Sequence, residues 1–217
     1  MILIPIKNLA TAKQRLASLL SQPVRTELAQ AMLLDVFDAV SACANCPEVS
    51  VVTSDPFAIE AAGQFDFAVI ADSANCSETD AIEMATRSCE SRGVTSTLVI
   101  PADIPLIQSS ELETVLADAP EQGSVLVPAA DGRGTNAAFR RPAALFPLRF
   151  GNDSFKPHLA AARATGMPCR ILSVPGIGLD IDNPVDLRQL AELRGDTRSQ
   201  RLARQWDLTD FSIAANE

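Results

Sequence analysis

Short apolar runs rich in β-branched residues alternate along the whole chain with longer segments of helical period. The strand candidates are residues 1–6, 49–54, 67–71, 96–101, 124–129, 136–141 and 169–174. The helix candidates are residues 12–20, 24–43, 56–63, 78–91, 110–117, 154–165 and 184–194. Strands that alternate with helices at this spacing predict an α/β fold with a mainly parallel sheet flanked by helices.

One pair of strands departs from this alternation. Residues 124–129 and 136–141 are separated only by ADGRGT, which contains Gly132 and Gly134. A connection this short predicts a hairpin, so the sheet should be mixed at this point. No linker or internal repeat is evident, and 217 residues suit one sizeable domain. We therefore expect one α/β domain over residues 1–194 and a polar C-terminal extension over residues 195–217. Within the extension, residues 198–206 have helical character.

Composition excludes some classes of partner. The formal net charge is −9, and nucleic acids and anionic membrane surfaces are bound by clustered Lys and Arg. No apolar run reaches the 18 or more residues of a membrane span, and the N-terminal MILIPIK lacks the features of a signal peptide. We therefore expect a cytoplasmic protein that binds neither nucleic acid nor membrane. The oligomeric state is open, with a homodimer as one candidate.

Five cysteines are present, and Cys43 and Cys46 have the C-x-x-C spacing found in zinc and redox sites. A second pair of ligands with similar spacing is missing, and the sole histidine, His158, is distant in sequence. We therefore interpret the cysteines as reduced, structural thiols.

Three aspartates follow predicted strands. Asp103 lies in PADIPLI after the strand at 96–101, and Asp180 and Asp182 lie in GLDIDNPVDL after the last strand. Ligands of open α/β sheets bind beyond the carboxyl ends of the strands, and residues two apart in an extended segment face the same side. If the three carboxylates converge, they suit Mg²⁺. For Asp182 alone, a role in stabilising the start of the helix at Pro184 is an equally good interpretation.

Anion-binding groups are predicted at three further places. Gly151 and Ser154 precede a helix, whose N-terminal N–H groups favour phosphate or carboxylate, although Asn152 or Asp153 could be an ordinary cap there. Thr135 lies in DGRGTN, which is either a close approach to a ligand or a plain hairpin turn. The cations that follow the first strand, where a triphosphate would need positive charge, are Lys7, Lys13 and Arg15. His158 is interpreted as structural.

Six segments occur in an order that resembles a known family: IPIKNLATAKQRLA, AMLLDV, PADIPLI, DGRGTNA, FGNDSFKPHLAAA and GLDIDNPVDL. Together, over about residues 2–193, they resemble the 2-phospho-L-lactate guanylyltransferases of coenzyme F420 biosynthesis. The resemblance implies a single-domain nucleotidyltransferase fold, similar to the nucleotide-diphospho-sugar transferases. It implies transfer of GMP from GTP to 2-phospho-L-lactate, phosphoenolpyruvate or 3-phosphoglycerate, with release of pyrophosphate.

Carried over by position, the resemblance implies that Asp103, Asp180 and Asp182 are catalytic and hold Mg²⁺. It implies that Thr135, Gly151 and Ser154 bind the phosphate and carboxylate of the acceptor, and that Lys13 and Arg15 lie against the GTP phosphates. Lys7 is assigned to the nucleotide from its place after the first strand.

The sequence departs from the family pattern before the fourth helix. A Gly-Leu-Asn stretch of many members is replaced by CSETDAIEMA, with Asp80 in the place of the asparagine. An aspartate can accept two hydrogen bonds from guanine, so we expect Asp80 to contact the base, although a different base choice is an alternative.

Two other functions are compatible with the sequence. One is a molybdopterin-type nucleotidyltransferase, although the glycine-rich loop that usually opens such proteins is missing from MILIPIKNLATAK. The other is a non-catalytic nucleotide-binding regulator, which the retention of the three aspartates disfavours. The sequence does not decide the identity of the acceptor.

Overall fold

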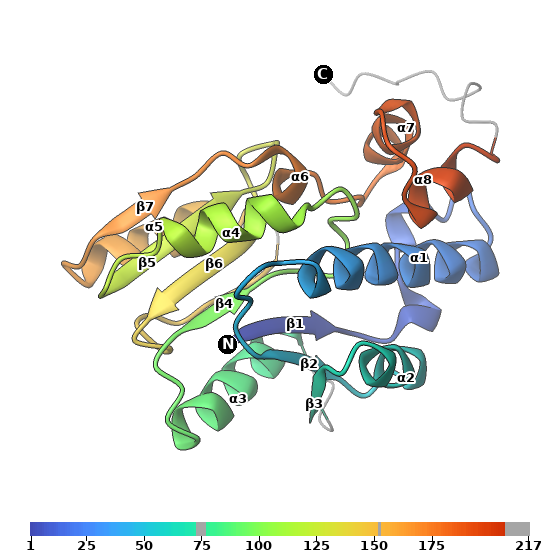
Figure 1. Cartoon of the computed structure of the whole chain (residues 1–217). Coiled ribbons are helices and arrows are strands. Elements are labelled where there is room, and N and C mark those ends of the chain that lie inside the picture. The colour runs from blue at the N-terminus through green and yellow to red at the C-terminus, as the bar shows by residue number, and fades with distance from the viewer. Residues whose placement is uncertain (73–76, 152, 207–217) are drawn as a thin grey trace.

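The computed structural model describes residues 1–72, 77–151 and 153–206. Its centre is a seven-stranded sheet with the order β3-β2-β1-β4-β6-β5-β7 (Figure 1). The strands are β1 (Ile2–Ile6), β2 (Val49–Thr53), β3 (Ala68–Ala71), β4 (Thr97–Val99), β5 (Gly123–Pro128), β6 (Thr135–Arg141) and β7 (Cys169–Ile171). All neighbours pair in parallel except β6, which runs antiparallel to both β4 and β5. The predicted α/β fold with a mixed sheet and a β5–β6 hairpin is confirmed.

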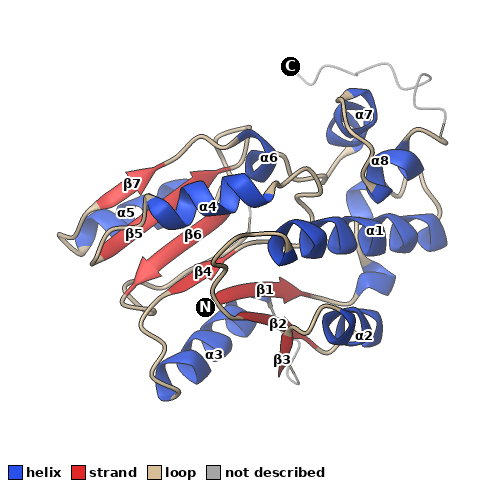
Figure 2. Ribbon diagram, in the orientation of Figure 1, coloured by secondary structure: helices blue, strands red, loops and turns tan. Residues whose placement is uncertain are grey.

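Helices cover both faces of the sheet (Figure 2). The α-helices are α1 (Gln22–Ser41), α2 (Pro56–Gln64), α3 (Glu78–Ser91), α4 (Ser109–Ala117), α5 (Phe155–Ala164), α6 (Pro175–Gly178), α7 (Pro184–Glu192) and α8 (Arg198–Ala203). Two short 3₁₀ helices, η1 (Leu9–Thr11) and η2 (Gln14–Leu16), follow β1. The core cluster on one face draws residues from α1, α2, α4 and α6–α8, and the cluster on the other face draws them from α3 and α5. The architecture is therefore a three-layer sandwich.

Strand periodicity divides the core between these two layers. In β1, Ile2, Ile4 and Ile6 belong to the cluster under α1, whereas Leu3 belongs to the cluster under α3. Successive side chains of a strand point to opposite faces, so a strand covered on both faces reads as an unbroken apolar run. This is why MILIPI is apolar throughout.

The chain after β1 differs from the sequence prediction. Instead of one helix at 12–20, η1 and η2 are separated by Lys13, whose backbone is left-handed with φ of 55°. A left-handed residue other than glycine interrupts a right-handed helix and is common where a functional site constrains the backbone. The side chain of Lys13 contacts Asp103 and Asp182. The strand expected at 169–174 is also shorter, and the one-turn helix α6 follows it.

The first part of the C-terminal extension packs on the domain. In α1, the buried Asp35 accepts hydrogen bonds from the backbone N–H groups of Arg198 and Ser199 at the start of α8, at 2.9 Å each. The α8 side chain of Gln200 donates to the carbonyl groups of Leu190 and Leu193 at 3.2 and 3.0 Å. The predicted helical character of 198–206 is thus confirmed at Arg198–Ala203. Among the residues described, no helix has the length and apolarity needed to cross a membrane.

The C-x-x-C pair lies beside the core. Cys43 is buried and Cys46 is half-buried, and both are free thiols. Burial raises the pKa of Cys43, and burial together with the neighbouring Cys43 raises the pKa of Cys46 to about 12. Thiols with raised pKa values are poor nucleophiles and poor metal ligands, which favours the structural interpretation.

Candidate active site

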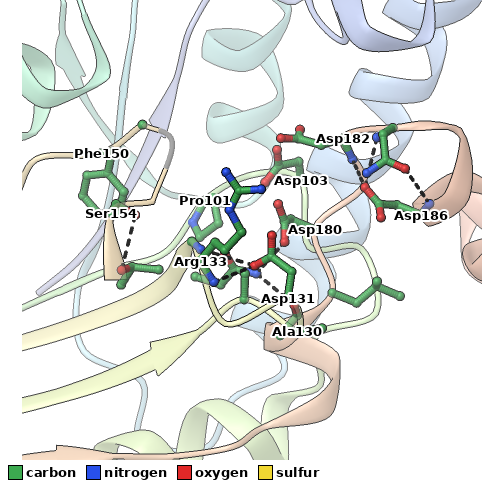
Figure 3. A pocket seen from close by; sticks show the side chains of 18 of the residues that line it. Pro101, Asp103, Ala130, Asp131, Arg133, Phe150, Ser154, Asp180, Asp182 and Asp186 are labelled. Atoms are coloured by element: carbon green, nitrogen blue, oxygen red, sulfur yellow. Dashed lines mark hydrogen bonds between the residues drawn. The ribbon is translucent and has the colours of Figure 1, made fainter. Parts of the chain in front are cut away.

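A cleft lies at the carboxyl ends of the parallel strands, where β1 and β4 are neighbours. The chain continues from β1 to β2 and β3 on one side, and from β4 to the remaining strands on the other side. Such a reversal of strand order is where open α/β sheets bind ligands. The cleft consists of two adjoining pockets of about 650 and 420 Å³. Five residues line both pockets and mark their junction: Arg15, Glu78, Pro101, Asp103 and Asp182. Figure 3 shows the larger pocket, with Asp103, Asp180 and Asp182 on one side and Phe150 and Ser154 on the other.

Lys13 bridges two of the predicted carboxylates. Its Nζ lies 2.6 Å from Asp103 Oδ2 and 2.9 Å from Asp182 Oδ1, and Arg15 Nη1 lies 3.2 Å from Asp182 Oδ2. Although burial opposes the protonated form, the two carboxylates raise the pKa of Lys13 above its usual value. Burial also opposes ionisation of Asp182, yet Lys13 and Arg15 lower its pKa. Asp103 and Asp182 therefore converge on one buried cation.

Backbone contacts hold the Asp182 segment in place. The N–H of Ile181 donates to the carbonyl oxygen of Asp103 at 3.0 Å, which joins the segment after β4 to the segment after α6. Asn183, not Asp182, caps α7, and Asp186 completes the capping box by accepting from the backbone N–H of Asn183. Asp182 is therefore not the cap of α7, and its side chain pairs with Lys13 and Arg15 instead.

Asp180 lies beside this pair and has a different environment. Its Oδ1 accepts from the buried Asn136 Nδ2 at 3.0 Å, and the same amide contacts the carbonyl oxygens of Ile177 and Gly178. Burial raises the pKa of Asp180; the Asn136 amide opposes this, and the charges of Asp103 and Asp182 add to it. The charges of Asp103 and Asp182 thus reach Asp180, but within the described part of the chain the three carboxylates are not gathered into one group that could hold a metal ion.

The donor chemistry of this cluster fits Mg²⁺. Mg²⁺ takes hard oxygen ligands, and usually one or two carboxylates complemented by water and substrate phosphates. Asp103 and Asp182 already hold the ammonium group of Lys13 between them, so a cation is stable at their meeting point. Within residues 1–72, 77–151 and 153–206, no group of three or more His, Cys, Asp or Glu side chains is gathered closely enough to form a complete metal cage. Two carboxylates with substrate oxygens match this arrangement better than a cage of protein ligands.

The three residues predicted to bind the acceptor line the far side of the larger pocket. Thr135 at the start of β6 and Ser154 before α5 are both buried, and their hydroxyl oxygens lie 3.4 Å apart. Gly151 has a φ of 135°, a conformation that favours glycine. Thus Thr135, Gly151 and Ser154 lie together although they are up to 19 residues apart.

The cap predicted for α5 is not formed by Asp153. Its carboxylate pairs with Arg133, with Oδ1 2.5 Å from Nε, and the Arg133 carbonyl accepts from the N–H of Phe155 at 2.9 Å. The other candidate, Asn152, lies outside the described residues. The hairpin loop and the start of α5 are consequently joined, so the loop is part of the pocket wall and not a plain turn.

The other two residues predicted to contact the nucleotide, Lys7 and Asp80, differ in whether they line the cleft. Lys7 lines the smaller pocket and pairs with the buried Asp72 at 2.7 Å. Asp80 does not line either pocket; its Oδ2 accepts from Ser77 Oγ at 2.6 Å in the first turn of α3. Two residues earlier, Glu78 lines both pockets, and burial followed by the charge of Asp103 raises its pKa to about 7.

Sequence reasoning missed several residues of the site. Asn136 directly follows Thr135, but a buried strand amide has no distinctive local pattern. Glu78 is a first-turn acid that would ordinarily be read as a dipole-stabilising residue. Asp186 was recognisable, because Asn183-x-x-Asp186 matches the capping-box spacing.

The chain is similar to proteins of known name over most of its length. The model of the family described as guanylyl transferase CofC like matches residues 1–211. A phosphoenolpyruvate guanylyltransferase from Sphaerobacter thermophilus is 35% identical over 87% of this chain and 90% of its own. A 2-phospho-L-lactate guanylyltransferase from Methanothermobacter thermautotrophicus is 30% identical over 87% of this chain and 82% of its own.

Solved structures agree on the fold. A crystal structure from Desulfovibrio desulfuricans G20, described as a nucleotide-diphospho-sugar transferase, has a TM-score of 0.76 at 17% identity and covers 94% of this chain and 93% of its own. A nucleotidyl transferase from Methanothermobacter thermautotrophicus has a TM-score of 0.59 at 17% identity and covers 94% of this chain and 97% of its own. The predicted nucleotidyltransferase-like fold is confirmed.

Proposed function

Because the chain belongs to the CofC-like guanylyltransferase family, we propose that it transfers GMP from GTP to a small phosphorylated acid and releases pyrophosphate. The chain is thus a nucleotidyltransferase. The proposed acceptors are 2-phospho-L-lactate, phosphoenolpyruvate and 3-phosphoglycerate, and the proposed product is an intermediate of coenzyme F420 biosynthesis. The relatives named for the first two acids support this choice.

One observation carries the proposal: a buried cationic side chain bridges Asp103 and Asp182 at the junction of the two pockets. A junction of this kind suits a reaction between two anions, because positive charge is needed where the reactants meet. Asp103 and Asp182 would hold Mg²⁺, with Asp180 beside them. When bound, Mg²⁺ would neutralise the repulsion between the acceptor and the nucleotide phosphates.

In the proposed reaction an ionised oxygen of the acceptor phosphate attacks the α-phosphorus of GTP. One P–O bond forms there, and the bond to the β-phosphate breaks, so that its electron pair leaves with pyrophosphate. The attacking oxygen is already deprotonated at neutral pH, and no general base is required. Lys13 and Arg15 would stabilise the charge that develops on the leaving pyrophosphate.

The two pockets suggest where each substrate binds. The larger pocket contains the hydroxyl groups of Thr135 and Ser154 and the backbone at Gly151, which suit the acceptor's phosphate and carboxylate. The smaller pocket is lined by Lys7, Lys13 and other residues after β1, which suit the nucleotide. Contact between Asp80 and guanine stays a prediction, since Asp80 lies outside both linings.

Pyrophosphate release tests the proposal. Purified protein is assayed with Mg²⁺, each of the three acids, and GTP, with CTP as a nucleotide control. We expect release with GTP and at least one acid. Asp103→Asn keeps the side-chain volume but removes the charge, so turnover should fall at least a hundredfold while the circular dichroism spectrum is unchanged. The matched control is Asp66→Asn, an exposed position with φ of 56° that asparagine tolerates.

Two results would count against the proposal. One is the absence of pyrophosphate release with GTP and every acid. The other is near-normal turnover in Asp103→Asn, which would show that this carboxylate does not contribute to the transition state.

A further inference from the structure

The single histidine of the chain lies directly behind the proposed acceptor pocket. His158 in α5 is only 1% exposed, and its Nδ1 lies 2.9 Å from Thr135 Oγ1. Its Nε2 accepts a hydrogen bond from the backbone N–H of Arg149 at 2.7 Å. The edge of Phe150 packs against the ring at a centroid distance of 5.1 Å. Both ring nitrogens therefore have partners, and the ring cannot rotate freely.

These partners select one tautomer. The N–H of Arg149 can only donate, so Nε2 must keep its lone pair, and a neutral imidazole then carries its proton on Nδ1. Burial, and secondarily the charge of Arg140, lowers the pKa of His158 to about 4, so the ring is neutral at physiological pH. The Nδ1–H group consequently donates to Thr135 Oγ1.

This donation determines what Thr135 can do. A hydroxyl oxygen has two lone pairs, and Thr135 Oγ1 accepts from His158 and, at a longer 3.4 Å, from Ser154 Oγ. Among the described residues, nothing accepts the proton of the Thr135 hydroxyl itself. Since Thr135 lines the larger pocket, that proton can be donated into the pocket, to water or to a ligand that accepts hydrogen bonds.

We propose that His158 is a positioning residue that makes the Thr135 hydroxyl a one-way donor to an anionic oxygen of the acceptor. This inference rests on the proposed function and identifies what the pocket recognises: a fully ionised phosphate or carboxylate oxygen, which accepts hydrogen bonds without offering a proton. A ligand hydroxyl group in the same place could only accept a hydrogen bond from Thr135 and could not donate one to it.

The first test uses the fact that the chain has only one histidine. Long-range ¹H–¹⁵N correlation spectra of labelled protein will contain a single imidazole pattern, which requires no assignment. We expect a protonated Nδ1 and an unprotonated Nε2, unchanged between pH 8 and 5.5. A protonated Nε2, or a charged imidazolium at pH 7, would overturn the proposal without any activity measurement.

The second test is a double-mutant cycle on steady-state kinetics. His158→Leu and Thr135→Val each remove one partner of the contact. We expect each to raise the KM for the acceptor about tenfold or more, as for loss of a hydrogen bond to a charged group, while the KM for GTP stays the same. If His158 acts through Thr135, the KM of the double variant for the acceptor is no higher than that of the more impaired single variant. His158→Asn, whose side-chain amide N–H is bonded to Cγ as Nδ1–H is, should recover part of the acceptor affinity.

The outcomes separate the inference from the proposed function. Additive losses in the cycle, or equal changes in both KM values, indicate a merely structural histidine and refute the inference while the proposed function stands. Failure of every acid to support pyrophosphate release refutes the proposed function, whereas the tautomer measurement still decides the state of His158.

Discussion

Replacement of Lys13 by methionine should lower the stability of the metal-free protein and increase the stabilisation that Mg²⁺ gives. The ammonium group contacts Asp103 at 2.6 Å and Asp182 at 2.9 Å, and the Lys13 side chain is 8% exposed. Methionine keeps the apolar stem of lysine but leaves two carboxylates facing each other. The same pair of oxygens should then be available to a divalent cation, because their built-in competitor is gone.

The expected loss of stability follows from the geometry. At an effective dielectric constant of about 20, each contact is worth roughly 6 kcal/mol of gross attraction, most of which is offset by the desolvation of the three ions. Removal of one partner of a buried ion pair costs about 3–5 kcal/mol. The carboxylates of Asp103 and Asp182 are 30% and 37% exposed, so solvent screening favours the lower end, about 3 kcal/mol. For a chain of this size that loss lowers the Tm by about 6–12 °C.

Thermal unfolding in EDTA and over a Mg²⁺ titration measures both effects. In EDTA the variant should unfold at a lower temperature than the wild type. With Mg²⁺ the gap should narrow, since a tenfold gain in metal affinity adds about 1.4 kcal/mol of stability at saturating metal. The control is Lys156→Met, the same change at an exposed lysine of α5, which should alter neither quantity.

A variant with the same response to Mg²⁺ as the wild type would refute the reasoning. Lys13 would then not occupy the cation position, and Asp103 and Asp182 would lose their assignment as the metal-binding pair.

Two further predictions concern stability. Gly176→Ala should destabilise the fold by about 1–3 kcal/mol in urea unfolding, because its Cβ would lie 2.4 Å from the backbone oxygen of Leu106. In contrast Gly63→Ala, at an exposed helical position with open space, should stabilise it by about 0.5–1 kcal/mol, and equal effects would disprove the steric argument. Glu78→Gln should increase stability at pH 8 but not at pH 4. With a folded pKa of about 7 against the ordinary 4.5, ionised Glu78 destabilises the native state progressively as pH rises through this window, by at most about 3 kcal/mol. If Glu78→Gln increases stability equally at both pH values, burial of the charged carboxylate is excluded as the cause of the increase.

Much of the fold is readable from the sequence because helices and strands depend on neighbouring residues. The apolar stripe of the first long helix includes Leu28, Met32 and Val36, and all three are fully buried in the core of α1. Asp55 and Asn183 precede prolines, and each caps its helix as the local pattern requires. The positions of Asp103 and Asp182 at one sheet edge also follow from general rules, since parallel strands end at the same edge.

The contacts that turn this edge into a site depend on distant residues. Lys13 lies 90 residues from Asp103 and 169 residues from Asp182, and reaches them through a left-handed backbone that no local pattern predicts. The placement of Asp80 was also beyond local reasoning, because it depends on how the first turn of α3 faces the cleft.

The sequence by itself thus determined the order of helices and strands and the edge where the acidic residues gather. Only the tertiary structure decided that Lys13 stands between two carboxylates, that Asn183 and not Asp182 caps α7, and that His158 orients Thr135. The physical reason is range: hydrogen bonding and periodic burial act over a few residues, whereas charge pairing and tautomer choice depend on groups that only the packed fold brings within 3 Å.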